Sequence, residues 1–168
     1  MLTDLEFAYL SLDDLKPDPR NPRTHSKKQI EQIAASMTEL GFAGAIVINP
    51  DRTIIAGHAR YRAARLLEMT KVPTITVTGL TSDQEKLLRI ADNKLALNGG
   101  WDLHLLKVQI DEIRLVGLNV ELTGYSVGEI DVMLSGPDDP DDDVIPALPE
   151  AAITRTGDIW LCRRSPNW

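Results

Sequence analysis

The stretch TIIAGHARYRAA, residues 53–64, decides the fold of this chain. Its first four residues are mostly β-branched and predict a buried strand, and Gly57 then leads at once into residues that favour a helix. The first backbone N–H groups of a helix lack partners within the helix and carry partial positive charge, so this junction can accept an anion. Gly57 allows close approach to the backbone, and Arg60 and Arg62 add forked donors that suit phosphate oxygens. The spacing alone leaves equally open that the two arginines only solvate an exposed helix face.

Hydrophobic periodicity predicts the elements on either side of this junction. Pro17, Pro19 and Pro22 exclude a helix before residue 26 and predict a long loop. Pro73 favours the edge of a sheet or the start of a strand, because proline cannot donate to a neighbouring strand. The expected strands are residues 7–12, 45–48, 53–56 and 72–77, and the expected helices are residues 26–40, 57–69, 82–94, 103–117 and a short one after Ser126.

Three serine-led pairs resemble capping boxes, in which two side chains at a helix start accept each other's backbone N–H groups. Each pair predicts where a helix begins, and Gly41 predicts where the first helix ends. The pairs are Ser26 with Gln29, Ser82 with Glu85, and Ser126 with Glu129.

Together these elements predict an α+β fold, with a small mixed sheet covered by helices and followed by a helical subdomain. Residues 1–80 are expected to form the α/β core, and residues 81–135 the helical subdomain of the same domain. Residues 136–150 are acidic, rich in proline and aspartate, and too poor in apolar side chains to form a core, so they predict a linker. Residues 151–168 are too few for a domain and are expected to begin a following region.

Charge, cysteine content and the length of apolar runs exclude several classes of protein. Residues 1–94 contain 13 Lys and Arg against 12 Asp and Glu, whereas residues 95–168 contain 5 against 13. The acidic second half therefore offers no basic recognition helix for DNA. Cys162 is the single cysteine, which excludes a disulfide framework and a structural zinc site and fits a reducing cytoplasm. No apolar run approaches the roughly 20 residues that span a bilayer, so no membrane partner is expected.

Four phrases of the sequence occur in an order that resembles the ParB/sulfiredoxin superfamily. They are NPRTHS (21–26), IIAGHARYRAA (54–64), IADNKLALNGGWD (90–102) and LTGYS (122–126). The chain is most similar to the ParB-like domain that precedes DNA methyltransferases in phage and prophage proteins, and the resemblance covers about Tyr9 to Leu134. It implies a ParB/sulfiredoxin-like fold and a nucleotide site, which takes CTP in partition ParB proteins and ATP in sulfiredoxins.

The resemblance also implies which residues form the nucleotide site. The phosphates would be faced by Gly57, His58, Arg60 and Arg62. A bound Mg²⁺ or a phosphate would be approached by Asn93, with Asp92 as its acidic neighbour. Three further residues belong to family segments that contain or adjoin the nucleotide site, namely Asn21, Arg23 and Ser36.

Two departures from the family bear on catalysis. Partition ParB proteins carry a glutamate at the position of His58 and an arginine at that of Ala59, so we expect nucleotide hydrolysis to be absent or very slow. Sulfiredoxins carry their reactive cysteine at the position of His58, and a histidine cannot form the sulfur–sulfur intermediate, so sulfiredoxin activity is excluded. His58 stays a candidate general base because its ordinary pKa lies near neutrality, but a phosphate-facing donor needs no catalytic role.

These features favour a nucleotide-binding module, for CTP or ATP, that regulates or guides a DNA-modifying enzyme. The segment TRTGDIWLC (154–162) is similar to the one that leads into the methyltransferase domain of the same architecture. The catalytic Asp-Pro-Pro-Tyr motif does not occur in the sequence, so this chain by itself is not expected to methylate DNA. DNA would be contacted through the full-length protein or a partner methyltransferase, and a homodimer is left open. Two alternatives are a nuclease or phosphotransferase that uses the same pocket, and an interaction module that has lost nucleotide binding.

Overall fold

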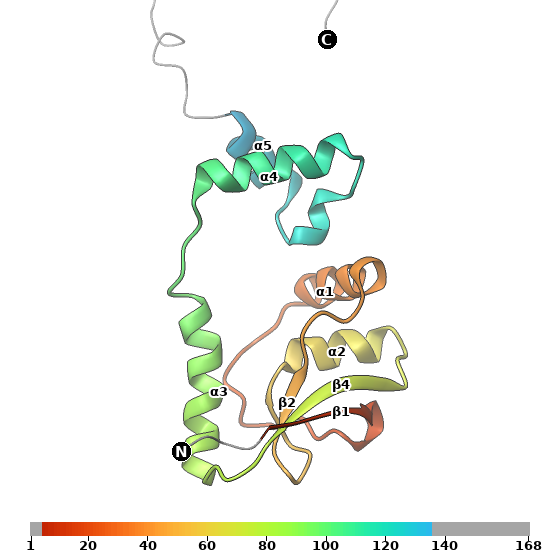
Figure 1. The fold of residues 1–168 in the computed structure, drawn as a ribbon, viewed down its shortest axis with the longest axis vertical. Coiled ribbons are helices and arrows are strands. Elements are labelled where there is room, and N and C mark those ends of the chain that lie inside the picture. Colours follow the sequence, from red (N-terminus) through yellow and green to blue (C-terminus); the bar gives the residue numbers. More distant parts are fainter. Residues whose placement is uncertain (1–4, 136–168) are drawn as a thin grey trace, which may run out of the picture. The chain divides into compact units, whose positions relative to one another are not determined.

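Residues 5–135 of the protein are described by a computed structural model, and all structural statements below concern them (Figure 1). Strands and helices are mixed along the chain up to residue 77, and only helical elements follow within the described residues. None of the described helices is long and apolar enough to cross a membrane. The expected linker at 136–150, the region at 151–168 and Cys162 lie outside the described residues.

The sheet has four strands in the order β1-β4-β2-β3. β1 (Leu5–Ser11) pairs antiparallel with β4 (Lys71–Val77) along its whole length. β2 (Ile46–Ile48) lies parallel to β4 and antiparallel to β3 (Ile54–Ala56), to which a tight turn connects it. A mixed sheet covered by helices confirms the expected α+β fold class.

Pro73 does not mark an edge strand, because β4 lies between β1 and β2. The proline stands opposite Tyr9 of β1, and the pairing of β4 with β2 begins one residue later, at Thr74. The expectation of an edge strand is therefore wrong, although Pro73 does lie near the start of its strand. A central strand tolerates this proline because β2 is short and leaves Pro73 without a partner on that side.

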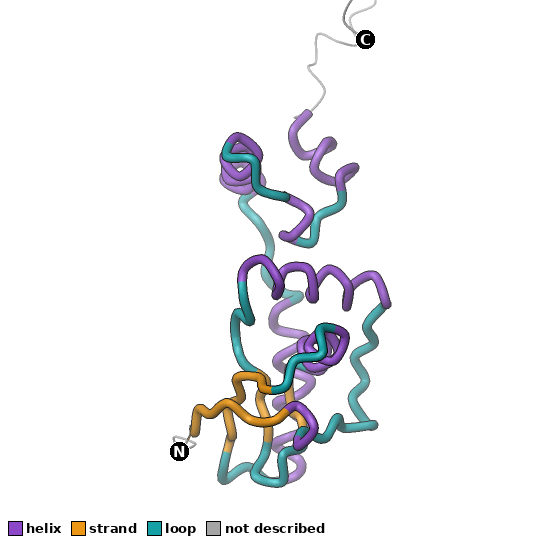
Figure 2. The backbone as a smooth tube through the Cα atoms, turned by 90° about the vertical axis from the view of Figure 1, so that its right-hand side faces the viewer, coloured by secondary structure: helices purple, strands orange, loops and turns teal. Residues whose placement is uncertain are grey.

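Two helices are stacked on one side of the sheet. α2 (His58–Leu66) lies against β2 and the 3-10 turn η1 (Leu12–Asp14), and α1 (Lys27–Leu40) packs on α2 (Figures 1 and 2). Their apolar faces close a core with the sheet, because burying these side chains removes them from water. The buried members of this core are Leu12, Leu15, Ile46, Ile48, Ile54, Ala64 and Val72.

The helical part follows β4. α3 (Ser82–Ala96) lies beside β3, and residues 97–102 form a non-helical connection to α4 (Leu103–Leu115). A 3-10 turn that the sequence did not predict, η2 (Val120–Thr123), contacts α1 and leads to α5 (Val127–Ser135). A second, smaller core joins these last elements through Ile110, Val120 and Ile130.

The cap of α3 lies one residue earlier than expected. The Thr81 side chain accepts the N–H of Gln84, and Gln84 Oε1 accepts the N–H of Thr81 at 2.8 Å, which makes a full capping box. Ser82 is thus the first helical residue, and the box expected to start there is wrong. The box expected at Ser126 with Glu129 is confirmed. Ser26 is confirmed as a cap, since its side chain accepts the N–H of Gln29, but the other half of its box is not formed, because Gln29 Oε1 contacts His25 Nδ1.

Ile54→Ala is expected to lower the free energy of unfolding by about 2–5 kcal/mol, because it leaves a cavity in a fully buried site of the core. The measurement is urea unfolding followed by circular dichroism. Leu115→Ala is the matched control, since Leu115 is 86% exposed, and its unfolding free energy should change by less than about 0.5 kcal/mol. Equal losses in both variants would mean that the core around β3 is not packed as described.

Candidate functional site

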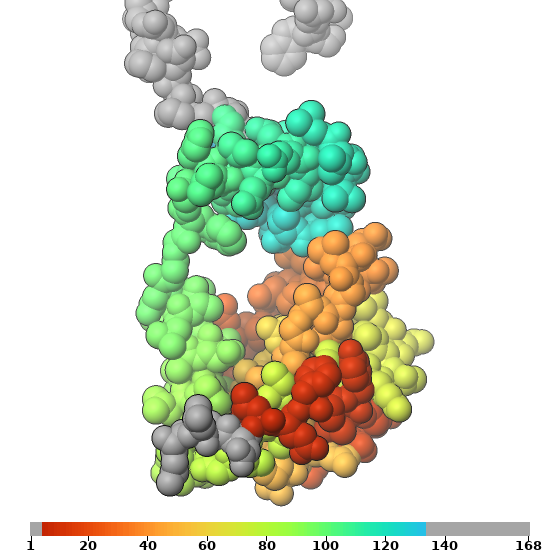
Figure 3. All heavy atoms as spheres, viewed as in Figure 1, coloured from red at the N-terminus to blue at the C-terminus, as the bar shows by residue number. Residues whose placement is uncertain are grey.

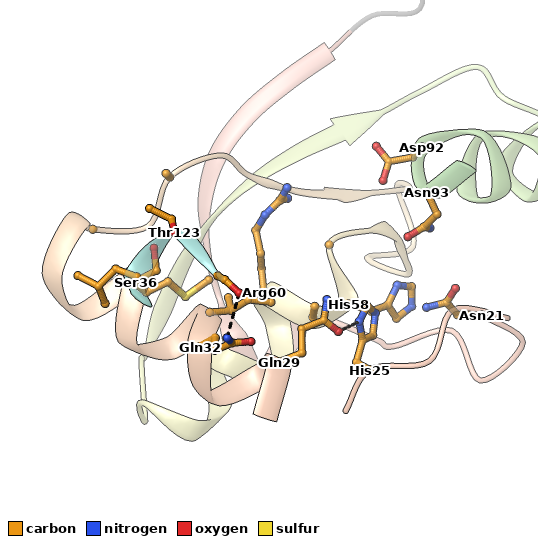
Figure 4. A pocket seen from close by; sticks show the side chains of 18 residues that line it. Asn21, His25, Gln29, Gln32, Ser36, His58, Arg60, Asp92, Asn93 and Thr123 are labelled. Atoms are coloured by element: carbon orange, nitrogen blue, oxygen red, sulfur yellow. Dashed lines mark hydrogen bonds between the residues drawn. The ribbon is translucent and has the colours of Figure 1, made fainter. Parts of the chain in front are cut away.

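A cavity of about 530 Å³ opens where six parts of the chain meet. It is lined by the loop before α1, one face of α1, the loop after α1, the start of α2, the end of α3, and η2 with the glycine that follows it. Figure 3 shows the opening between α3, in green, and α1, in orange, and Figure 4 shows the side chains around it. Because these parts lie far apart in the sequence, only the folded chain contains this site.

Gly57 connects β3 to α2 at the wall of the cavity. Its φ of 96° lies in the left-handed region that favours glycine, and an added Cβ would stand 3.3 Å from the Cα of Ile46. No side chain caps α2, and its first intrahelical hydrogen bond runs from the N–H of Tyr61 to the carbonyl of Gly57. The earlier N–H groups of α2 therefore have no partner within the helix, at a wall formed by Gly57, His58, Ala59 and Arg60.

Arg60 lines the cavity and also supports its wall. Its Nη1 donates to the carbonyl of Ala45 at 2.7 Å, just before β2. Gly44 has a φ of 90°, in the left-handed region that favours glycine, and an added Cβ there would stand at an ordinary contact distance of 3.5 Å from Arg60 Cζ. A guanidinium has five N–H donors, and this contact uses one of them. The side chain can thus hold the loop before β2 and still bind an anion.

The imidazole of His58 is buried, with 6% of the residue exposed. Its Nε2 accepts the backbone N–H of Asp18 at 3.3 Å, so the neutral ring carries its proton on Nδ1. Burial, followed by the positive charge of Arg89, lowers the pKa of His58 to about 4 against the opposing effect of the Asp18 carboxylate. His58 is therefore neutral near pH 7 and a weak base.

A buried ion pair joins the loop before α1 to α3. Arg89 Nη2 lies 2.7 Å from Asp18 Oδ2, and the two side chains are 5% and 1% exposed. Burial raises the pKa of Asp18, but hydrogen bonds from Arg20 and the charge of Arg89 outweigh it and keep the pKa below its ordinary value. Sequence reasoning missed this pair, because neither residue belongs to a pattern that marks burial.

Two further contacts shape the wall on the side of α1, and both are drawn in Figure 4. His25 Nδ1 lies 3.0 Å from Gln29 Oε1, and Gln32 Nε2 donates to the carbonyl of Gly124 at 3.3 Å. The second contact ties α1 to the end of η2. The four-residue spacing of His25 and Gln29 is a signal that the sequence offered, whereas nothing in it pointed from Gln32 to Gly124.

Most of the residues predicted for a nucleotide site line this one cavity. They are Asn21, Ser36, Gly57, His58, Arg60 and Asn93, together with Asp92. Arg23 and Arg62 were predicted with them but are not among the lining residues, and Arg62 is exposed on α2. Asn93 Nδ2 donates to the carbonyl of Arg89 at 2.8 Å, which leaves its second N–H and its amide oxygen to meet a ligand. Within residues 5–135, no group of three or more His, Cys, Asp or Glu side chains could hold a metal ion.

The fold and this cavity define an α+β domain with a polar site at a strand–glycine–helix junction. The chain belongs to the family described as the ParB N-terminal domain, whose model matches residues 3–93. This match confirms the resemblance to the ParB/sulfiredoxin superfamily.

Relatives of known description support the same family. The ParB-like nuclease domain-containing protein YnaK of Escherichia coli is 38% identical over 86 residues, which are 51% of this chain and 99% of that protein. The chromosome-partitioning protein Spo0J of Thermus thermophilus is 30% identical over 88 residues, but these are 32% of its length against 50% of this chain. The chain thus matches nearly all of the first relative and about a third of the second.

A solved structure supports the fold over a longer stretch. The C-terminally truncated chromosome-partitioning protein ParB from Caulobacter crescentus, complexed with CTP-gamma-S, has a TM-score of 0.64 at 19% identity. The likeness covers 77% of each chain. At this identity it establishes the fold, which extends beyond the ParB N-terminal match into the helical part.

A second family model, described as the ParB-methyltransferase HTH domain, matches residues 104–156. α4, η2 and α5 are the described part of that range. The acidic charge of this half had predicted no recognition helix, so the helix-turn-helix match is a feature that sequence reasoning missed. The reason is that charge balance does not report how helices pack. The matched range also includes the residues expected to form a linker.

The buried neutral His58 is expected to make stability depend on pH. Its pKa is about 4 in the folded chain and 6.5 when unperturbed, so the unfolded chain binds more protons between these values. The stabilisation that the neutral imidazole gives the folded chain is therefore fully present well above pH 6.5 and is lost as the pH falls toward 4. At pH 5 the free energy of unfolding should be lower by about 2 kcal/mol than at pH 7.5. Urea unfolding at pH 7.5 and pH 5 measures this loss.

His58→Gln removes the titrating group and should flatten the pH dependence, whereas His104→Gln, at an exposed position, should retain it. Asp18 contributes little between pH 5 and 7.5, because its pKa in the folded chain lies below the ordinary value of 3.8 and the carboxyl is largely ionised in both states over this range. An unchanged pH dependence in His58→Gln would contradict the burial of a neutral imidazole.

Proposed function

We propose that the cavity binds the triphosphate of a nucleotide, with CTP as the first candidate and ATP as the second. The observation that carries the proposal is the Gly57 junction, where the uncapped start of α2 and the Arg60 guanidinium share one wall. Backbone N–H groups at a helix start and a guanidinium are both typical partners of phosphate oxygens. The Caulobacter relative was solved with CTP-gamma-S, which supports testing CTP first.

Mg²⁺ would bind together with the phosphates. Asp92 and Asn93 lie at the end of α3 that lines the cavity, and each carries an oxygen of the kind that Mg²⁺ prefers. Mg²⁺ commonly takes one or two protein ligands and fills its remaining positions with phosphate oxygens and water. Two protein ligands therefore suit a cation that arrives with the nucleotide.

The domain would use this site to regulate or guide a DNA-modifying enzyme, for which a DNA methyltransferase is the first candidate. Two observations support that link. The family model that matches residues 104–156 is described as the ParB-methyltransferase HTH domain, and the segment TRTGDIWLC is similar to the lead-in of such enzymes. DNA would be met by the full-length protein or by the partner methyltransferase.

A nuclease is the second candidate, and the description of the E. coli relative favours it. The chemistry of the cavity favours it less. Metal-dependent nucleases hold their ions with several carboxylates, whereas Asp92 is the single carboxylate among the described lining residues. An interaction module that has lost nucleotide binding is the third candidate, and it would follow if the purified chain binds neither CTP nor ATP.

Arg60→Ala is expected to weaken CTP binding by about tenfold to a hundredfold, because a charge-assisted hydrogen bond contributes about 1.5–3 kcal/mol. Arg60→Lys should restore only part of the affinity, since one ammonium group does not reproduce a planar fork. Calorimetric titration of the purified chain with CTP and then ATP, with and without Mg²⁺, measures both effects.

Arg65→Ala is the matched control, because Arg65 contacts Asp13 and Tyr61 and does not line the cavity. Its affinity should stay near that of the parent. The ligand-free melting temperature of Arg60→Ala should fall slightly, since the bond to Ala45 is lost. If the parent binds no nucleotide, or if Arg60→Ala binds as tightly as the parent, the phosphate site is wrong.

Nucleotide turnover by this chain is expected to be absent or very slow. The imidazole at the helix start has a pKa lowered to about 4 and its Nε2 is already bonded to Asp18, so it is poorly suited to activate water. Phosphate release from CTP and ATP measures turnover. Robust release that disappears in His58→Ala would make His58 a catalytic base and overturn this expectation.

A further inference from the structure

β1 is an edge strand whose outer side meets no other strand among the described residues. The N–H of Leu12 donates to the carbonyl of Thr70 at 3.0 Å, which continues the register in which Ser11 faces Lys71. In an antiparallel pair, alternate residues turn their backbone groups toward the partner strand. It follows that the residues at even positions in β1 bond to β4. The residues that turn their N–H and C=O groups to the free edge are Leu5, Phe7, Tyr9 and Ser11.

The side chains beside this free edge are apolar and exposed. Leu5, Phe7 and Tyr9 project from the sheet face that does not carry Leu10, which packs on the core, and they are 65%, 61% and 64% exposed. Phe7 and Tyr9 already contact each other, with ring centroids 5.6 Å apart in an edge-to-face arrangement. A long, unpaired and apolar edge of this kind is a template for another strand.

We propose that β1 pairs antiparallel with β1 of a second copy of this chain, about a two-fold axis at Ala8. In this register Leu5 faces Ser11, Glu6 faces Leu10, and Phe7 faces Tyr9 of the other copy. Every backbone group on the free edge then meets a partner, because residues at odd positions face one another.

The sequence of β1 fits this occupant. The register sets an aromatic ring of one copy opposite an aromatic ring of the other, a favourable cross-strand pair. Glu6 is the only charged residue in the strand and faces a leucine, so no like charges stand opposite each other. A two-fold pairing also closes on itself and does not propagate into a fibre.

The other edge of the sheet cannot take this role. β3 has three residues, and the segment at Lys16 already bonds to it: the N–H of Ile54 donates to the carbonyl of Lys16 at 2.8 Å. α3 also lies against β3. The free edge of β1 therefore has the β1 of another copy as its self-complementary partner, and the inference does not depend on nucleotide binding.

The test is sedimentation equilibrium of the full chain from micromolar to submillimolar concentration. The parent should form a dimer. Phe7→Lys with Tyr9→Lys sets ammonium groups opposite each other across the axis and should weaken association at least tenfold. Phe7→Lys with Tyr9→Glu sets opposite charges across the same axis and should restore much of it. Both positions are exposed, so circular dichroism should show an unchanged monomer fold.

Leu115→Lys with Val116→Lys is the matched control, since these side chains are 86% and 72% exposed on another element. It should associate like the parent. The register is read separately by Ala8→Cys in a Cys162→Ser background, because Ala8 of one copy would face Ala8 of the other at a distance that a disulfide can bridge. A parent that stays monomeric, or a Phe7→Lys with Tyr9→Lys variant that associates like the parent, would overturn the proposal.

Discussion

The carboxylate of Asp18 is buried, and much of the site depends on the groups that compensate its charge. An ionised carboxylate removed from water is stable only when it is paired and hydrogen-bonded. Arg89 of α3 supplies the opposite charge at 2.7 Å, and Arg20 supplies three hydrogen bonds from the same loop. Loss of Asp18 would leave the buried Arg89 guanidinium without this counter-charge, and loss of Arg89 would leave the buried carboxylate with the exposed Arg20 alone. The loop before α1 and the helix after β4 are therefore held to each other, and the cavity lies where they meet.

This pair also fixes the chemistry of the adjacent histidine. The backbone N–H of Asp18 occupies His58 Nε2, and the charge of Arg89 opposes protonation of the ring. A histidine at the start of a helix would otherwise be a natural candidate for acid–base work. Here its surroundings give it a fixed tautomer and a low pKa, so its position favours a structural role with one N–H left to donate. Asp18 and Arg89 thus set the tautomer and the protonation state of His58, which lies forty positions after Asp18 in the sequence.

Arg60 has a structural contact and, in the function proposed above, a second role in binding. Its bond to the carbonyl of Ala45 holds the chain segment that enters β2. The remaining donors belong to the same wall as the start of α2. Because the bond to Ala45 already orders the guanidinium, binding of an anion would cost less arginine side-chain entropy than it would at a free surface arginine.

The sequence by itself determined the parts of the fold that depend on local patterns. The strand–glycine–helix junction at Gly57 followed from a β-branched run and a residue that tolerates a positive φ, and the caps at Ser26 and Ser126 followed from side chains that reach neighbouring N–H groups. Motif order further indicated the family, and most of the site residues that it implied line the cavity, although other lining residues such as Gln32 and Thr123 were not predicted. The tertiary structure decided what depends on partners distant along the chain. It placed Pro73 in a central strand, moved Arg62 out of the cavity lining, brought Gly124 to Gln32, and buried Arg89 against Asp18. Local periodicity cannot encode these outcomes, because each is set by which segments meet when the whole core closes.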